Sequence, residues 1–367
     1  MVRCLAFVVV SLLAVRAADA GELNSAALRG SRVDEVGPSY PVFERQPIYR
    51  DPRGYDIVPP SYGSATTVQP VPVAALPGYS FEVGARYWYS SGKLAKDLFD
   101  DPRFSNVLNS RLTYDGLTAH SFEAFGRIDL PSGLFLKGFA GIAGLPKGKL
   151  NDEDFPPGID PYSSTLSDQT GGRLNYAAID FGYAFVANAR ATVSLFGGYG
   201  FVGEKVNAYG CSQIATSPIC DPSIPSSVLG ITEDANWHLA RVGIATNVKI
   251  IDRLMLTAEA AWVPWAVVNS QDTHWLRTGT TIGSFAGPVP QTASGSGVQL
   301  EALLAYQVWD CFNIGLGGRY WRFDAPRGSG DLEQTIIGWT SPISQPMKFT
   351  SERYGMFVQG SYKFSAM

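Results

Sequence analysis

The feature that most constrains this chain is a period-2 alternation of apolar and polar residues that recurs from Ser80 onward. Successive side chains of a β-strand point to opposite faces, so the alternation predicts strands with one face in an apolar environment. Ten candidate strands follow, at 80–91, 119–130, 133–145, 173–187, 190–206, 236–250, 253–269, 297–309, 312–325 and 350–364. The pattern therefore predicts an all-β chain.

The connections between these strands alternate in length. Four are tight turns, at Pro131-Ser132, Asn188-Ala189, Ile251-Asp252 and Asp310-Cys311. The other five are each more than twenty residues long, at 92–118, 146–172, 207–235, 270–296 and 326–349. A soluble sandwich has no reason to alternate in this way, whereas outer-membrane barrels combine short inner turns with long outer loops and an even strand number. We therefore expect residues 79–367 to form a ten-stranded antiparallel transmembrane β-barrel with long extracellular loops.

The last candidate strand supports this expectation. One face carries Met356, Val358, Tyr362 and Phe364, and the other carries Gln359, Ser361 and Lys363. Such an apolar-out, polar-in strand ending in an aromatic residue resembles the C-terminal assembly signal of outer-membrane proteins. A closed barrel also pairs every backbone group internally, as a span through lipid requires.

The N-terminal region is expected to be exported and then to precede the barrel. Residues 1–20 are predicted to be a signal peptide, with Arg3, an apolar run from Leu5 to Val15 and a cleavage signal at Ala18-Asp19-Ala20. Residues 21–78 are proline-rich and are expected to be an extended, disordered periplasmic segment. Because no later segment offers 18 consecutive apolar residues, export leaves the periplasm, the extracellular space or the outer membrane. The predicted barrel makes the bacterial outer membrane the expected location.

Composition limits the classes of molecule that the chain is expected to bind. The net charge of -4 gives no reason to expect a nucleic acid, and charged residues make up only 17% of the chain. The expected partners are therefore outer-membrane lipid and molecules met at the cell surface. Cys211 and Cys220 lie in one polar loop, and an oxidising compartment favours a disulfide between them. No metal or cofactor is expected.

Two short acidic motifs could carry chemistry. His274 lies two residues after Asp272, so in an extended strand both side chains share one face, and the carboxylate could orient the imidazole of a general base. Asp152 and Asp154 have the same spacing in another long loop, where two like charges can hold a water between them. An acidic turn in solvent or a weak Ca²⁺ site would also explain the second pair.

Placed on a ten-stranded barrel, these motifs resemble the omptin family of outer-membrane endoproteases over most of residues 84–364. The family has Asp-x-Asp in its second outer loop and Asp-x-His in its fourth. Further matching segments are Ser91-Gly92-Lys93, Leu174-Asn175-Tyr176-Ala177 and the acid Asp168. The spacing from Leu256 to His274 also fits without a gap.

The resemblance implies peptide hydrolysis without a covalent intermediate. A water held between Asp152 and His274 would be activated by His274, which Asp272 would orient. Asp154 would position the water or the scissile carbonyl, and Asp168 would support the site. Lipopolysaccharide and surface peptides or proteins would then be the partners.

The sequence departs from the family at the specificity pocket. Ser270 aligns with one acidic residue of the pocket for basic side chains, and Lys96 or Asp97 with the other. The lipopolysaccharide-contacting triad aligns with Tyr199, Phe201 and Gly203, of which only the tyrosine is kept. A non-catalytic barrel acting as an adhesin or surface structural protein is the alternative, whereas the small strand number disfavours a porin, because a barrel of about 8 strands is filled by its own side chains.

Overall fold

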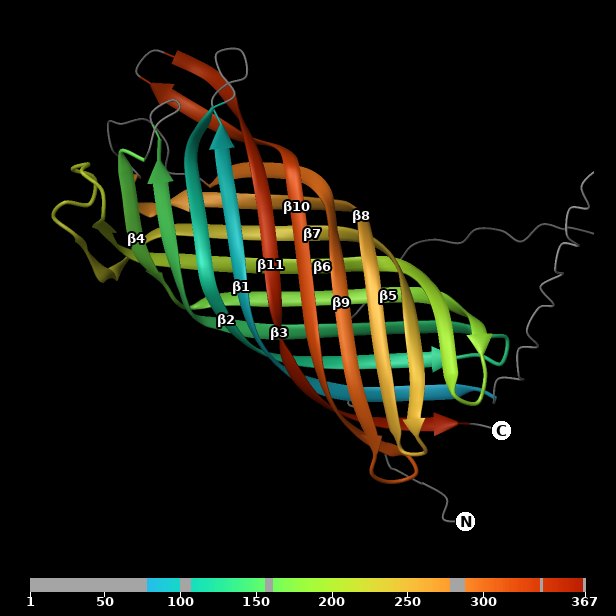
Figure 1. Cartoon of the computed structure of the whole chain (residues 1–367). Coiled ribbons are helices and arrows are strands. Elements are labelled where there is room, and N and C mark those ends of the chain that lie inside the picture. Colours follow the sequence, from blue (N-terminus) through green and yellow to red (C-terminus); the bar gives the residue numbers. More distant parts are fainter. Residues whose placement is uncertain (1–77, 100–106, 156–160, 278–287, 337–338, 366–367) are drawn as a thin grey trace, which may run out of the picture. The chain divides into compact units, whose positions relative to one another are not determined.

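The computed structural model describes residues 78–99, 107–155, 161–277, 288–336 and 339–365, without the side chains of 331–343 (Figure 1). The predicted signal peptide and nearly all of the proline-rich segment lie outside these ranges. The strands are β1 (Ser80–Phe99), β2 (Leu108–Asp129), β3 (Leu134–Asp154), β4 (Ser163–Gln169), β5 (Gly172–Ala187), β6 (Ala191–Gln213), β7 (Ile224–Ile251), β8 (Leu254–His274), β9 (Val289–Gln307), β10 (Phe312–Ile336) and β11 (Trp339–Ser365). A short 3₁₀ helix, η1 (Trp275–Arg277), follows β8, and no helix in the described ranges could span a membrane.

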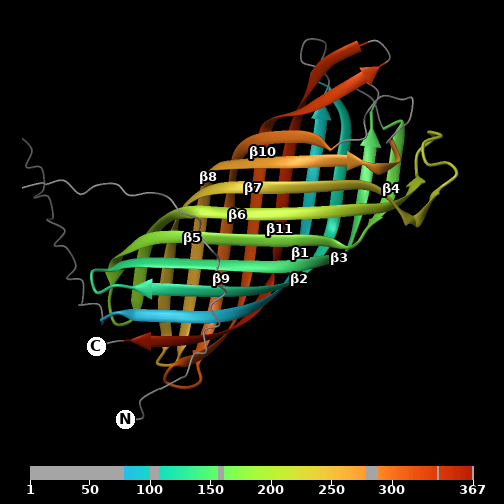
Figure 2. The same ribbon diagram turned by 180° about the vertical axis from the view of Figure 1, so that it is seen from behind.

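The strands form one closed antiparallel barrel. Each strand pairs with its neighbour in the chain, except that β4 and β5 do not pair with each other: both pair with β3 on one side and with β6 on the other. β11 returns to pair with β1. Ser80 lies opposite both Ser365 and Asp129, so the chain enters and leaves the barrel at its tight-turn end (Figures 1 and 2). The expected all-β barrel architecture is therefore confirmed.

The predicted strands were too short at the opposite end. β7 continues to Ile224 and β10 to Ile336, so much of the five predicted loops is strand. The fourth wall position is shared by two strands, β4 above and β5 below, and Gly171 between them adopts a φ of +66°. Glycine suits this junction because it lacks the Cβ atom that makes positive φ costly.

An apolar band surrounds the half of the barrel nearest the tight turns. Every second side chain there points outward and is exposed, such as Phe81 and Val83 in β1, Phe181 and Tyr183 in β5, and Leu300 in β9. Two histidines mark its upper edge: Tyr87 hydrogen-bonds His120 at 2.7 Å, and Tyr199 hydrogen-bonds His238 at 2.6 Å. Such a band, edged by aromatic residues, is the surface that barrels present to lipid.

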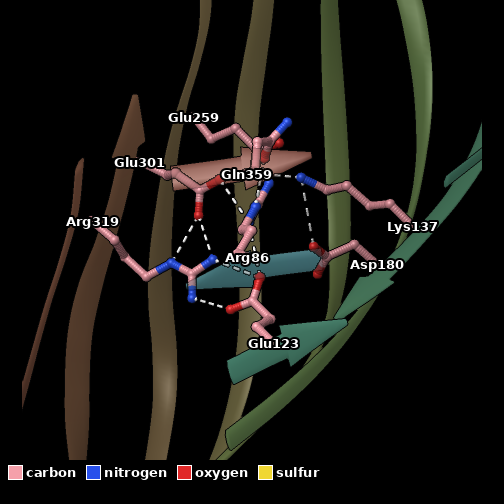
Figure 3. Close-up of polar contacts among 8 residues, drawn as sticks. All are labelled: Arg86, Glu123, Lys137, Asp180, Glu259, Glu301, Arg319 and Gln359. Carbon is pink, nitrogen blue, oxygen red and sulfur yellow. Dashed lines mark hydrogen bonds and ion pairs between the residues drawn. The ribbon is translucent and has the colours of Figure 1, made fainter. Parts of the chain in front are cut away.

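The interior at the level of the band is filled by charged side chains, which we call the lumen network (Figure 3). Its cations are Arg86, Lys137, Arg241 and Arg319, and its carboxylates are Glu123, Asp180, Glu259 and Glu301. Arg319 contacts Glu123 at 2.6 Å and Glu301 at 2.7 Å. The two signs are equal in number, which suits charges held away from water.

An aromatic layer lies above the lumen network. Trp88 packs edge-on against Trp321 with ring centroids 4.9 Å apart, and both contact Tyr176. Above it, Arg353 from β11 forms an ion pair with Glu204 from β6 across the barrel. Because side chains cross the interior at each of these levels, the lumen is filled rather than open.

Candidate functional site

One wall of the site is a row of inward side chains on the outer parts of β1, β2 and β3. Strand register places Lys96 opposite Leu112, and Leu112 opposite Asp152. The row below it contains Tyr114, which lies between Leu94 and Leu150. All of these residues lie beyond the apolar band, on the strand segments farthest from the tight turns.

The facing wall is formed by β7, β8 and β9. Glu233 lies directly opposite Asp272, and Ser270 lies opposite Gln291. All four side chains are buried, and the hydroxyl of Ser270 donates a hydrogen bond to Glu233. The alternation of β8 thus places Ser270 and Asp272 on the inner face, as the spacing of two predicts.

Lys96 joins the two walls. Its ammonium lies 2.6 Å from Oε2 of Glu233 and 2.7 Å from Oδ2 of Asp272. It also donates to Oε1 of Gln291 at 3.3 Å. Since β1 and β8 lie on opposite sides of the ring, this single side chain crosses the barrel interior.

The charges of this group shift one another. Burial opposes the ammonium of Lys96, but the carboxylates of Asp272 and Glu233 outweigh it and raise the pKa of Lys96. Burial also opposes the carboxylate of Asp272, yet Lys96 and His274 hold its pKa below the usual range. For Glu233, burial dominates over Lys96 and raises the pKa. Lys96 therefore stabilises the charged form of Asp272.

His274 lies at the end of β8 beside Asp272. Its Nε2 is 3.3 Å from Oδ2 of Asp272, the same oxygen that Lys96 contacts. The chain after His274 is anchored, because the indole N–H of Trp275 donates to Oγ1 of Thr232 at 2.9 Å. The imidazole is thereby held against a charged carboxylate, as an orienting partner requires.

Tyr114 connects the two acidic motifs. Its ring is buried, and its hydroxyl has no hydrogen-bond partner among the described residues. Burial raises the pKa of Tyr114, and the charges of Glu233, Asp272 and Asp152 raise it further. Strand register places Asp152 in the same inner row as Lys96, and Lys96 reaches Asp272, so the two motifs lie at the same end of the barrel. We call Lys96, Tyr114, Asp152, Glu233, Asp272 and His274 the rim cluster.

The remaining predicted site residues are placed differently. Asp154 lies two residues beyond Asp152 on the same face of β3, opposite Ser110. Asp168, expected to support the site, is exposed and pairs with Lys149 at 3.4 Å on the outside of the wall, so it does not join the rim cluster. The pairing of β4 with β6 has a register shift between Leu166 and Asp168. Cys211 and Cys220 form a disulfide at the end of β6.

Sequence reasoning missed Tyr114 and Glu233 as members of the site. Both lie in segments that were interpreted as loops, because their outer faces are polar and the apolar alternation stops there. Only the inner face of these segments carries a pattern that indicates a strand. The even-numbered residues of β1 stay buried from Trp88 to Lys96, and extending that period would have continued the strand.

The arrangement can support acid–base chemistry. It combines an imidazole, a carboxylate held charged beside it, a second carboxylate on the opposite wall and a protonated phenol. Oδ1 of Asp272 has no hydrogen-bond partner among the described residues, although it is buried. No group of three or more potential metal ligands occurs within the described part of the chain.

Comparisons with known proteins agree with the barrel. No family model matches the sequence, and no curated protein matches it either. Among solved structures, the outer membrane protease OmpT from Escherichia coli is similar with a TM-score of 0.66 and 12% identity, covering 81% of this chain and all of that one. Ail of Yersinia pestis (TM-score 0.25, 10% identity, 79% and 100% covered) and the toluene transporter TodX of Pseudomonas putida (0.26, 8%, 78% and 90%) are less similar. The chain therefore has the fold of an outer-membrane β-barrel.

Proposed function

We propose that this protein is an endopeptidase of the bacterial outer membrane that cleaves peptides at the cell surface. In this proposal the apolar band lies in lipid, the rim cluster faces the exterior and the N-terminal segment lies in the periplasm. The observation that carries it is the contact of His274 with Asp272 on the inner face of β8, at the same end of the barrel as Asp152 on β3. Likeness to a protease at 12% identity supports the fold, and the residues supply the chemistry.

The proposed reaction is direct attack by water. His274 accepts a proton from a water that also hydrogen-bonds Asp152, while Asp272 stabilises the imidazolium that forms. The water oxygen adds to the scissile carbonyl carbon, and the proton on His274 then passes to the leaving amine. Asp154 assists in positioning the water or the carbonyl. Lipopolysaccharide is the proposed lipid partner.

The test is peptide cleavage by purified protein reconstituted with lipopolysaccharide. A peptide library is incubated with wild type, His274→Ala and Asp152→Ala, and products are identified by mass spectrometry. We expect cleavage by wild type and its loss in both variants. His238→Ala is the matched control, because His238 lies at the edge of the apolar band and bonds Tyr199 instead.

A second candidate is a non-catalytic barrel that binds a surface partner. The observation favouring it is a groove of about 420 Å³. The groove is lined by Asp234, Asn236, Asn269, Ser270, Gln271, Pro290, Gln291, Thr292 and Ser329. Most of these side chains lie on the outer face of β7 to β10. If wild type cleaves no peptide, or if the variants cleave as well as wild type does, this candidate replaces the protease.

A further inference from the structure

Lys96 is coordinated as a bound ammonium ligand would be. A lysine ammonium has three N–H donors and no acceptor. Three acceptors surround it, namely Oε2 of Glu233, Oδ2 of Asp272 and Oε1 of Gln291, at 2.6, 2.7 and 3.3 Å. Each donor thus has one acceptor, and all three acceptors belong to the wall opposite Lys96.

The acceptors form a site that is independent of β1. Glu233 and Asp272 are cross-strand partners, and Ser270 holds Glu233 from the same face. Lys96 reaches this wall only through its side chain, and Leu94 below it packs in the apolar core. Deleting the side chain beyond Cβ would therefore leave the acceptors on their own strands, with two carboxylates and no cation between them.

We propose that Glu233, Asp272 and Gln291 form a binding slot for a primary ammonium group, and that Lys96 is its tethered occupant. In peptide hydrolysis, this occupant keeps lysine and arginine side chains out of the slot. Lys96 has no spare donor for an acidic side chain, so the substrate residue that lies against it is uncharged. The role in specificity rests on the proposed function, whereas the ammonium slot does not.

The direct test is binding of a free amine to Lys96→Ala. The atoms removed by this substitution correspond to n-propylammonium, which is the probe. We expect it to raise the thermal midpoint of the reconstituted variant, saturably, by at least about 3 °C. Wild type and Lys93→Ala, which removes an exposed lysine of the same strand, should shift no more than they do with sodium chloride at equal ionic strength. n-Propanol, which has the same length without the charge, should not replace the amine.

A second variant covers the case in which Lys96→Ala does not fold. Lys96→Ala/Glu233→Gln leaves one uncompensated carboxylate instead of two and is titrated in parallel. We expect a smaller midpoint shift than in the single variant, but one above that of wild type. If Lys96→Ala refolds only with n-propylammonium present, that result also supports the slot. If neither variant responds to the amine in midpoint or refolding yield, the slot is overturned.

The specificity role is tested on peptides. A matched series places lysine or norleucine at each position beside a bond that wild type cleaves. Wild type should prefer norleucine over lysine by about tenfold or more at one position, and Lys96→Ala should reduce that preference. Equal cleavage of both peptides by wild type would overturn the exclusion. Amine binding needs no proteolysis, so an inactive wild type would remove the proposed function and leave the slot to be judged on its titration.

Discussion

The lumen network and the rim cluster both place charges inside the same barrel, but they differ in balance. The lumen network has four cations, Arg86, Lys137, Arg241 and Arg319, for four carboxylates, Glu123, Asp180, Glu259 and Glu301. In the rim cluster, Lys96 lies between two carboxylates, Glu233 and Asp272, beside His274. Positive and negative charges are equal in number inside the apolar band. Beyond the band, negative charges outnumber positive ones.

The difference indicates which region is structural. Arg319 and Arg86 both contact Glu123 and Glu301, so these two carboxylates are matched by two cations, as groups that fix the interior should be. Asp272 at the rim shares Lys96 with Glu233 and holds an imidazole at the edge of solvent. Unbalanced charge beside an imidazole is typical of functional sites. Substitutions in the rim cluster should therefore lower activity, and substitutions in the lumen network should lower stability.

The largest effect is expected at the rim, on activity. Asp272→Asn should lower kcat/KM for a cleaved peptide by about 10²-fold or more, because the amide cannot stabilise the imidazolium of His274. The control is Asp324→Asn, which changes an aspartate paired with Arg322 on the outside of β10. A loss of less than tenfold in Asp272→Asn would place the chemistry elsewhere.

The next effect is expected in the lumen network, on stability. Arg319→Met should lower the free energy of unfolding by about 3–5 kcal/mol, because it leaves Glu123 and Glu301 buried with less compensation. Arg322→Met, which breaks a half-exposed pair on the outer face, should cost less than about 1 kcal/mol. Denaturant unfolding in lipid vesicles measures both. Equal costs would mean that the lumen network is no more structural than the surface.

A pH dependence is expected from Lys96. The pKa of Lys96 is raised in the folded barrel, so its contribution is complete below the unfolded-chain value of about 10.4 and decreases as the pH rises above it. The difference in unfolding free energy between wild type and Lys96→Met, about 3 kcal/mol at pH 8, should therefore shrink toward pH 11.5. A difference that is constant with pH would show that packing, not charge, accounts for it.

The smallest effect is expected at Tyr114. Its hydroxyl bonds no described residue, so Tyr114→Phe removes no direct protein hydrogen bond and should change the unfolding free energy by less than about 1 kcal/mol. The measurement is the same unfolding experiment. A cost above about 2 kcal/mol would contradict this placement of the hydroxyl.

The sequence predicted the half of the barrel that carries the apolar band better than the half that carries the site. Alternation such as Phe181 and Tyr183 against the inward Asp180 identifies a strand because its outer face is apolar. Beyond the apolar band the outer face of β7 carries Asp234 and Asn236. Both faces of the strand then contain polar residues, so the alternation can no longer be recognised. The motifs Asp-x-Asp and Asp-x-His were found by their spacing of two. Glu233 and Tyr114 were not found, because cross-strand register over a hundred residues cannot be deduced from spacing.

The central claim is that Asp152 and His274, from opposite walls of the barrel, act on one water. A double-mutant cycle on kcat/KM tests it, with Asp152→Asn, His274→Ala and the double variant. We predict that each single substitution costs about 10²-fold or more and that the double variant is little worse than His274→Ala alone, because groups that act as a unit are not additive. Independent losses that multiply in the double variant would contradict the shared water.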